Sequence, residues 1–184
     1  TVRLRVTDFA AGSTYANFPV TVQNVIYVDE DAAGGNNNGI SWANAFIYLQ
    51  DAIAAAHSGN EIWVAEGTYY PDRDTDHPTG TEARDASFLM KDEVAMYGGF
   101  DPATGDDEWS ERDWSTNETT LSGNIKNAGD DTDNSYNVVV GADGATLDGF
   151  TVTKGYADHA STERYQCGGG MYNEDVSPTV ANCT

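Results

Sequence analysis

The last part of the chain, residues 145–184, most constrains the fold, because it consists of short β-type runs without a helical pattern. The runs are ATLDGFTVTKG, GGGMYN and SPTVANCT, and Gly, Asp and Pro divide them. Residue character alternates within them, as where Leu147 lies between Thr146 and Asp148. Such alternation is typical of strands with one buried and one wet face. Short strands at near-even spacing predict a stacked, solenoid-like architecture, and the stop at Thr184 suggests a fragment or an end that needs a partner.

One strong helical pattern precedes these strands, in residues 42–56. Ser41 is a suitable N-cap, and the pair Ser58-Gly59 is a suitable end. Apolar residues recur here at spacings of four and three, which predicts an amphipathic helix. The residues of this apolar face are Trp42, Phe46, Leu49, Ile53 and Ala56.

The first residues, 1–25, predict two strands joined by a loop. Val2 and Leu4 alternate with Arg3, and the stretch 19–25 alternates again. One interpretation is the last hairpin of an Ig-like or cadherin-like sandwich. The other is a cap on the domain that follows, because a lone hairpin is marginally stable in water. We therefore divide the chain into a β-strand segment at 1–25 and a domain at 26–184.

The run YVDEDAAGGNNNGISWANAFIYLQDAIAAAHSGNEIWVAEGTYYP resembles the N-terminal capping region of secreted bacterial right-handed parallel β-helix proteins. The pieces SFLMKDEVAMYGGF, ERDWSTNETTLSGNI, NSYNVVV and ATLDGFTVTKG continue the resemblance in order. GGGMYN and SPTVANCT are similar to Gly-rich coils of the polymorphic-outer-membrane-protein type. The resemblance covers residues 26–184. It implies an all-β, pectin-lyase-like solenoid whose first coil is capped by the helix 42–56.

In such a solenoid the interior collects aliphatic, aromatic and small side chains. We expect the following residues to form it: Ile62, Val64, Phe88, Val94, Met96, Leu121, Val138, Val140, Leu147, Phe150, Val152, Met171 and Val180.

The charge of the chain excludes some partners. It carries 30 acidic and 9 basic residues, a net charge of -21. Nucleic-acid binding requires Lys and Arg to neutralise phosphates, so nucleic acid is not expected as a partner. No run approaches the ~20 apolar residues of a membrane helix, so no membrane insertion is expected in this segment.

Calcium is the cofactor that the acidic loops favour. Asp29 and Asp31 precede a Gly/Asn-rich stretch that includes Asn36 and Asn38. Side-chain oxygens in a flexible loop suit a hard cation, although the closing Glu of an EF-hand is missing. The alternative is turn chemistry, since Asp, Asn and Gly favour loops without any metal.

Two tryptophans are candidates for sugar binding, and two cysteines are candidates for a disulfide. Trp109 and Trp114 flank a long acidic loop, where they either stack on sugars or anchor the loop on the wall of the protein. Cys167 and Cys183 form a disulfide if they lie on neighbouring strands, and otherwise they are packed thiols.

No catalytic constellation is apparent in the sequence, so no catalytic residue is assigned. We therefore expect a non-enzymatic, secreted or cell-surface structural or adhesive β-helix module. Exposed strand edges make self-assembly into a homo-oligomer or filament a further expectation. The alternatives are a fragment of a polysaccharide lyase or glycoside hydrolase, and a carbohydrate-binding module with a polysaccharide as partner.

Overall fold

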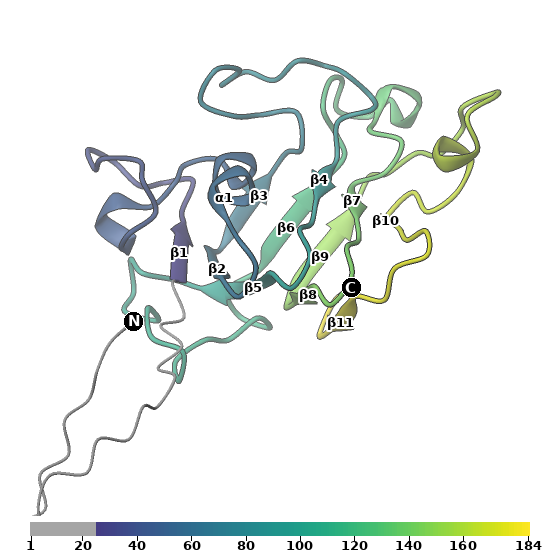
Figure 1. The fold of residues 1–184 in the computed structure, drawn as a ribbon. Helices are drawn as coiled ribbons and strands as arrows, with labels where there is room; N and C mark the ends of the chain where they lie inside the picture. Colours follow the sequence, from purple (N-terminus) through teal and green to yellow (C-terminus); the bar gives the residue numbers. More distant parts are fainter. Residues whose placement is uncertain (1–24) are drawn as a thin grey trace, which may run out of the picture.

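A computed structural model describes residues 25–184 (Figure 1). The hairpin expected in 1–25, and its relation to a sandwich domain, lie outside the described residues apart from Val25, where the first strand begins.

The largest sheet has five parallel strands in the order β1-β2-β5-β8-β11. Its inner positions are apolar and in register: Ile62 pairs with Met96, and Met96 with Leu147. All three side chains are buried, as the period-two pattern of a one-sided strand requires. The strands are β1 (Val25–Val28), β2 (Glu61–Ala65), β5 (Ala95–Phe100), β8 (Thr146–Asp148) and β11 (Thr179–Ala181).

Two smaller parallel sheets complete the strand structure. One has the order β3-β6-β9, and the other has the order β10-β7-β4. From β2 onward, consecutive strands lie in different sheets, so each sheet pairs strands from separate passes of the chain. The strands are β3 (Gly67–Tyr69), β6 (Thr119–Ser122), β9 (Phe150–Thr153), β4 (Phe88–Leu89), β7 (Val139–Val140) and β10 (Met171–Tyr172).

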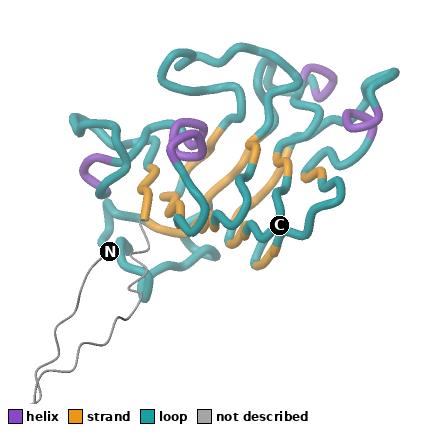
Figure 2. Tube along the Cα trace, viewed as in Figure 1, coloured by secondary structure: helices purple, strands orange, loops and turns teal. Residues whose placement is uncertain are grey.

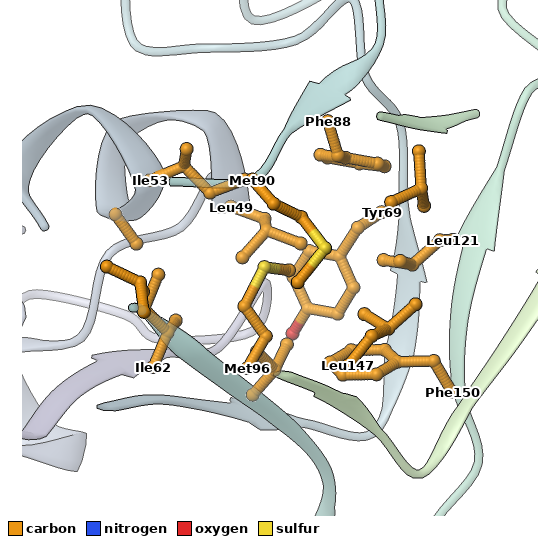
Figure 3. Packing of buried hydrophobic residues seen from close by; sticks show 14 of the residues in the cluster. Leu49, Ile53, Ile62, Tyr69, Phe88, Met90, Met96, Leu121, Leu147 and Phe150 are labelled. Atoms are coloured by element: carbon orange, nitrogen blue, oxygen red, sulfur yellow. The ribbon is translucent and has the colours of Figure 1, made fainter. Parts of the chain in front are cut away.

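The three sheets enclose one hydrophobic core (Figure 3). Most of the expected interior residues are buried there, but Val180 is 50% exposed, and three others are half-buried: Val140, Val152 and Met171. The core also takes in Tyr69 and Met90, which the sequence pattern does not single out.

The prediction of one helix over residues 42–56 is wrong, because the observed helix is shorter. The segment divides into a 3-10 turn at Trp42–Asn44 and the helix α1 at Leu49–Ala55. Between them the backbone is extended, because Phe46 pairs with β1: its N–H donates to Tyr27 and its carbonyl accepts from Asp29. Pairing with a strand and helical hydrogen bonding compete for the same backbone groups, so the helix starts later.

The shortened helix α1 still packs on the core. It contacts β1, β2 and β4, and it buries Leu49, Ala52 and Ile53. The Lys91 ammonium donates to the carbonyls of Ala54 (2.7 Å) and Ala56 (2.9 Å) at the end of the helix, where carbonyls lack helical partners.

The predicted fold class, an all-β right-handed parallel β-helix with a capping helix, is contradicted. Helix accounts for 11% and strand for 26% of the described residues, in three small, mostly parallel sheets, and no solenoid is recognised among them. The physical reason is the loops, which take most of the chain between the short strands (Figure 2). Two further 3-10 turns lie in these loops, at Asp131–Asp133 and Glu163–Gln166.

Candidate functional site

An aromatic ladder runs across the outer face of the five-stranded sheet. Tyr27, Trp63 and Tyr97 occupy matched positions in β1, β2 and β5. Their sequence neighbours Ile62 and Met96 point into the core. Successive side chains of a strand point to opposite faces, so the three aromatic side chains lie outside.

Other rings enlarge this ladder into an aromatic cluster. Phe100 stacks on Trp63 with ring centres 4.7 Å apart and 8° between the planes, and Trp42 lies 5.5 Å from Phe100. Trp109 lies 5.6 Å from Trp63 and 4.8 Å from Tyr97. Such edge-to-face and offset contacts are the preferred geometries of aromatic pairs. The aromatic cluster comprises Tyr27, Trp42, Trp63, Tyr97, Phe100 and Trp109.

The aromatic cluster holds the long acidic loop, residues 101–118, against the sheet. Besides the packing of Trp109, the indole N–H of Trp42 donates to the carbonyl of Asp107 at 2.9 Å. Trp109 is nevertheless 48% exposed. The sequence leaves two roles open for Trp109, stacking on sugars and anchoring the loop. The contacts in the structure are of the kind that anchors the loop.

Arg112 fixes the far end of the same loop. Its side chain is only 4% exposed and forms an ion pair of 2.8 Å with Asp148 on β8. The guanidinium also donates to the carbonyls of Gly98 and Asp148, and it lies 4.9 Å from the ring centre of Trp114. One buried cation therefore links the loop to two neighbouring strands. The sequence gives no reason to single Arg112 out among the basic loop residues.

Trp114 lies beside a groove of about 560 Å3. Its backbone packs against Gly99 and its β-carbon against Gly149, both glycines at positive φ, and a β-carbon at Gly99 would come within 2.7 Å of the Trp114 backbone. Glycine is the residue that accepts this conformation and this close approach. Trp114 is 43% exposed, so the loop presents this residue to solvent at a fixed position.

The groove combines this aromatic wall with polar side chains from three parts of the chain. They are Ser115 and Glu118 of the loop, Thr151 of β9, and Asn182 and Thr184 after β11. Thr119 of β6 also lines the groove, but its hydroxyl is buried and bonded to Ala65 and Gly99. Among the residues that line the groove, Glu118 supplies the one carboxylate side chain, and neither Lys nor Arg is present. Glycoside hydrolases commonly use two carboxyl groups across the bond, so this lining suits binding better than hydrolysis.

The turn that carries Trp114 is held by Asp113. Its carboxylate accepts from the Ser115 hydroxyl (2.6 Å), the Ser115 N–H (2.9 Å) and the Thr116 hydroxyl (3.1 Å). These hydrogen bonds, led by the Ser115 hydroxyl, lower the pKa of Asp113 below its usual value. The arrangement is a local Asx-type turn.

The four residues predicted to bind calcium lie in one loop, and several of their groups already have partners. The carboxylate of Asp29 accepts from the N–H of Asp31, and the Asn38 side chain accepts from Ile40. Asn36 uses its N–H, which donates to the side chain of Asn44. Within residues 25–184 no group of three or more His, Cys, Asp or Glu side chains could hold a metal ion. Calcium at this loop stays a prediction from the sequence.

Burial perturbs two carboxyls beside this loop. It raises the pKa of Asp29 and of Glu30 above their usual values, while hydrogen bonds from the N–H groups of Asp31 and Thr68 partly oppose it. The folded state therefore binds these protons more tightly than the unfolded chain does. Stability is gained as pH falls through the raised folded-state pKa values, and it is lost as pH rises above them.

We expect Asp29→Asn and Glu30→Gln each to raise the melting temperature at pH 7 by roughly 1–2 °C. Both variants keep the oxygen that accepts a backbone N–H and remove a charge that is costly to bury. The gain should shrink as pH falls through the raised pKa values of the wild-type carboxyls. Scanning calorimetry from pH 4 to 8 measures this, with the exposed Asp76→Asn as the charge-matched control. A gain that is equal at all pH values would contradict the assignment.

Both cysteines are free thiols. Cys167 is exposed and Cys183 is half-buried, and the sulfur of Cys183 lies 3.6 Å from the carbonyl of Leu147. Among the described residues no helix is long and apolar enough to cross a membrane.

Comparisons with protein-family models, with curated proteins and with solved structures gave no match to the chain.

Proposed function

We propose that this chain is a non-enzymatic adhesive module of a secreted or cell-surface protein, and that it binds a neutral polysaccharide in the groove beside Trp114. The observation that carries the proposal is the half-exposed Trp114, fixed at the wall of a groove of about 560 Å3 among hydroxyl, amide and carboxylate groups.

This combination matches the chemistry of a sugar chain. A pyranose ring has an apolar face that packs on an aromatic ring, and it has hydroxyl groups around its rim. A binding site with an aromatic wall and a few placed polar groups provides for both. Thr151 and Asn182 can exchange hydrogen bonds with hydroxyls, and Glu118 can accept them.

The charge favours a neutral ligand over an acidic one. The chain carries a net charge of -21, and the groove is lined by a carboxylate side chain and by no basic side chain. Like charges repel across an interface and slow association. Uronic-acid polymers are therefore expected to bind more weakly than glucans, xylans or mannans.

A polysaccharide lyase or hydrolase is the second candidate, and Glu118 in the groove is the observation that favours it. A lone carboxylate with neither a second acid nor a basic residue beside it in the lining gives this candidate less support. Incubation with the same polysaccharides, followed by analysis of reducing ends and unsaturated products, separates the two. If the wild type forms such products and the Glu118→Gln variant does not, the chain is an enzyme.

The test of binding is calorimetric titration with cellohexaose, xylohexaose and mannohexaose. We expect at least one hexaose to bind, and Trp114→Ala to weaken that binding at least roughly tenfold, because the stacking wall is lost. The control is Trp109→Phe, which keeps a ring in the aromatic cluster and should leave affinity within about threefold of wild type.

Three results would overturn the proposal. One is a failure of all three hexaoses to bind. Another is unchanged affinity in a folded Trp114→Ala variant. The third is loss of binding in Trp109→Phe alone, which would move the site to the aromatic cluster.

A further inference from the structure

A second, smaller cavity lies where the start of α1, the strand β3 and the loop after β3 meet. Its volume is about 190 Å3, and it shares no lining residue with the groove beside Trp114. Pockets for drug-sized ligands have volumes of about 300–1,000 Å3, so this cavity suits a smaller molecule. Its walls combine apolar side chains with one cation, Arg73, and one anion, Glu30.

The cation of the cavity is held in place but is not neutralised. The guanidinium of Arg73 lies 4.1 Å from the ring centre of Tyr70, and its backbone N–H donates to the Tyr70 carbonyl at 3.3 Å. Arg73 has no ion-pair partner among the described residues. A guanidinium that stacks on a ring keeps the N–H groups in its plane free for a carboxylate.

The anion of the cavity is held separately. One carboxylate oxygen of Glu30 accepts from the N–H of Thr68 at 2.7 Å, and its backbone N–H donates to the Tyr69 hydroxyl at 3.3 Å. Burial raises the pKa of Glu30, and the positive charge of Arg73 is one of the influences that oppose this rise. The two charges therefore act on each other within one cavity, although no ion pair joins them.

The loop that carries Arg73 is fixed to α1 and to the loop before it. The Thr75 hydroxyl donates to Asp51 at 2.6 Å and accepts from the Asn37 amide at 3.1 Å. The Gln50 amide donates to the carbonyl of Pro71. A wall that is already ordered costs little conformational entropy when a ligand binds.

We propose that this cavity binds a free α-amino acid with an apolar side chain. Arg73 takes the carboxylate of the ligand through paired hydrogen bonds, and Glu30 takes its ammonium group. The side chain of the ligand contacts Ile47, Leu49 and Pro78, which also line the cavity. A zwitterion satisfies both protein charges, and its zero net charge avoids repulsion by a chain of net charge -21. This proposal does not depend on the sugar-binding function.

The first test is a calorimetric titration at pH 7 with L-leucine, whose ammonium and carboxylate groups are both ionised there. L-leucinamide lacks the carboxylate, and N-acetyl-L-leucine lacks the ammonium group, so they represent the two ends of a peptide. We expect leucine to bind at least roughly tenfold more tightly than either analogue, because each analogue leaves one protein charge without its partner.

The second test uses variants of the two charged residues. Arg73→Met and Glu30→Gln should each weaken leucine binding at least roughly tenfold. Arg73→Met should leave leucinamide binding unchanged, because that ligand lacks the group that Arg73 takes. The matched controls lie outside the cavity: Arg164→Met removes a guanidinium 5.3 Å from the Tyr165 ring centre, and Glu66→Gln changes an exposed carboxylate. Both controls should bind leucine as the wild type does.

Three results would overturn the proposal. One is the absence of leucine binding at about 10 mM, a concentration that detects even a millimolar dissociation constant. Another is an analogue that binds as tightly as leucine, which would mean that the cavity takes one end of a peptide. The third is unchanged leucine affinity in folded Arg73→Met and Glu30→Gln variants, which would place the amino acid elsewhere.

Discussion

Replacement of Arg112 by methionine should lower the free energy of unfolding by about 3–5 kcal/mol, because it leaves Asp148 as a partly buried carboxylate without its ion-pair partner. For a domain of this size, the melting temperature should fall by roughly 10 °C. The substitution also removes donors from the carbonyls of Gly98 and Asp148. Calorimetry or chemical denaturation measures the loss.

Two variants control for this result. Arg112→Lys keeps the charge but lacks the planar group that bonds both strands, so it should retain only part of the stability. Arg73→Met removes a guanidinium that lies 4.1 Å from the Tyr70 ring centre and has no ion pair among the described residues. It should cost less than about 1 kcal/mol. Equal losses for Arg112→Met and Arg73→Met would refute the role of Arg112 as the anchor of the loop.

Gly155→Ala should cost about 3 kcal/mol or more, because a β-carbon at this position would overlap the carbonyl group of Gly169. The obstacle is backbone, so a change of side-chain rotamer cannot relieve it. The consequence should spread to Asn137 and Val138, which bond the backbone of residues 167–169.

Gly170→Ala is the matched control. Neither glycine has a positive φ, and the nearest atom to a β-carbon at Gly170 is 3.7 Å away, on Val152. This variant should change stability by less than about 0.5 kcal/mol. Unfolding measurements that give the two alanine variants the same stability would contradict the close backbone approach at Gly155.

Local alternation in the sequence predicts much of the core. Ile62, Met96 and Leu147 lie in short strands of the right period, and the structure buries them in register. Val180 follows the same pattern but stays half exposed, because β11 is the edge strand of its sheet. The alternation of apolar and polar residues shows which face of a strand is apolar. It does not show how many other strands pair with that strand.

The predictions of the helix and of the fold class are wrong because contacts between residues far apart in the sequence decide both. Residues 42–56 have a helical period, but β1 takes the backbone bonds of Phe46 and shortens the helix to Leu49–Ala55. Local propensity is a weak prior against such tertiary pairing. The prediction of an all-β solenoid is wrong because most of the chain forms long loops, whose sequences show no hydrophobic periodicity.

The candidate site is only partly visible in the sequence. Trp109 and Trp114 attract attention as aromatic residues in a loop, but their different surroundings depend on residues far away in the chain. The alternation along the strands could have predicted an outward orientation for Tyr27, Trp63 and Tyr97, since each follows an apolar, inward-pointing residue in its strand. Glu118 and Asn182 meet across a groove only through the sheet topology.

The most direct test of sugar binding at Trp114 follows the indole N–H signals of the four tryptophans in an NMR titration with the hexaose that binds best. We expect the Trp114 signal to move in proportion to binding. The signals of Trp42 and Trp63, whose N–H groups donate to Asp107 and Glu61, should stay in place. A hexaose that binds while the Trp114 signal does not move would contradict sugar binding at Trp114.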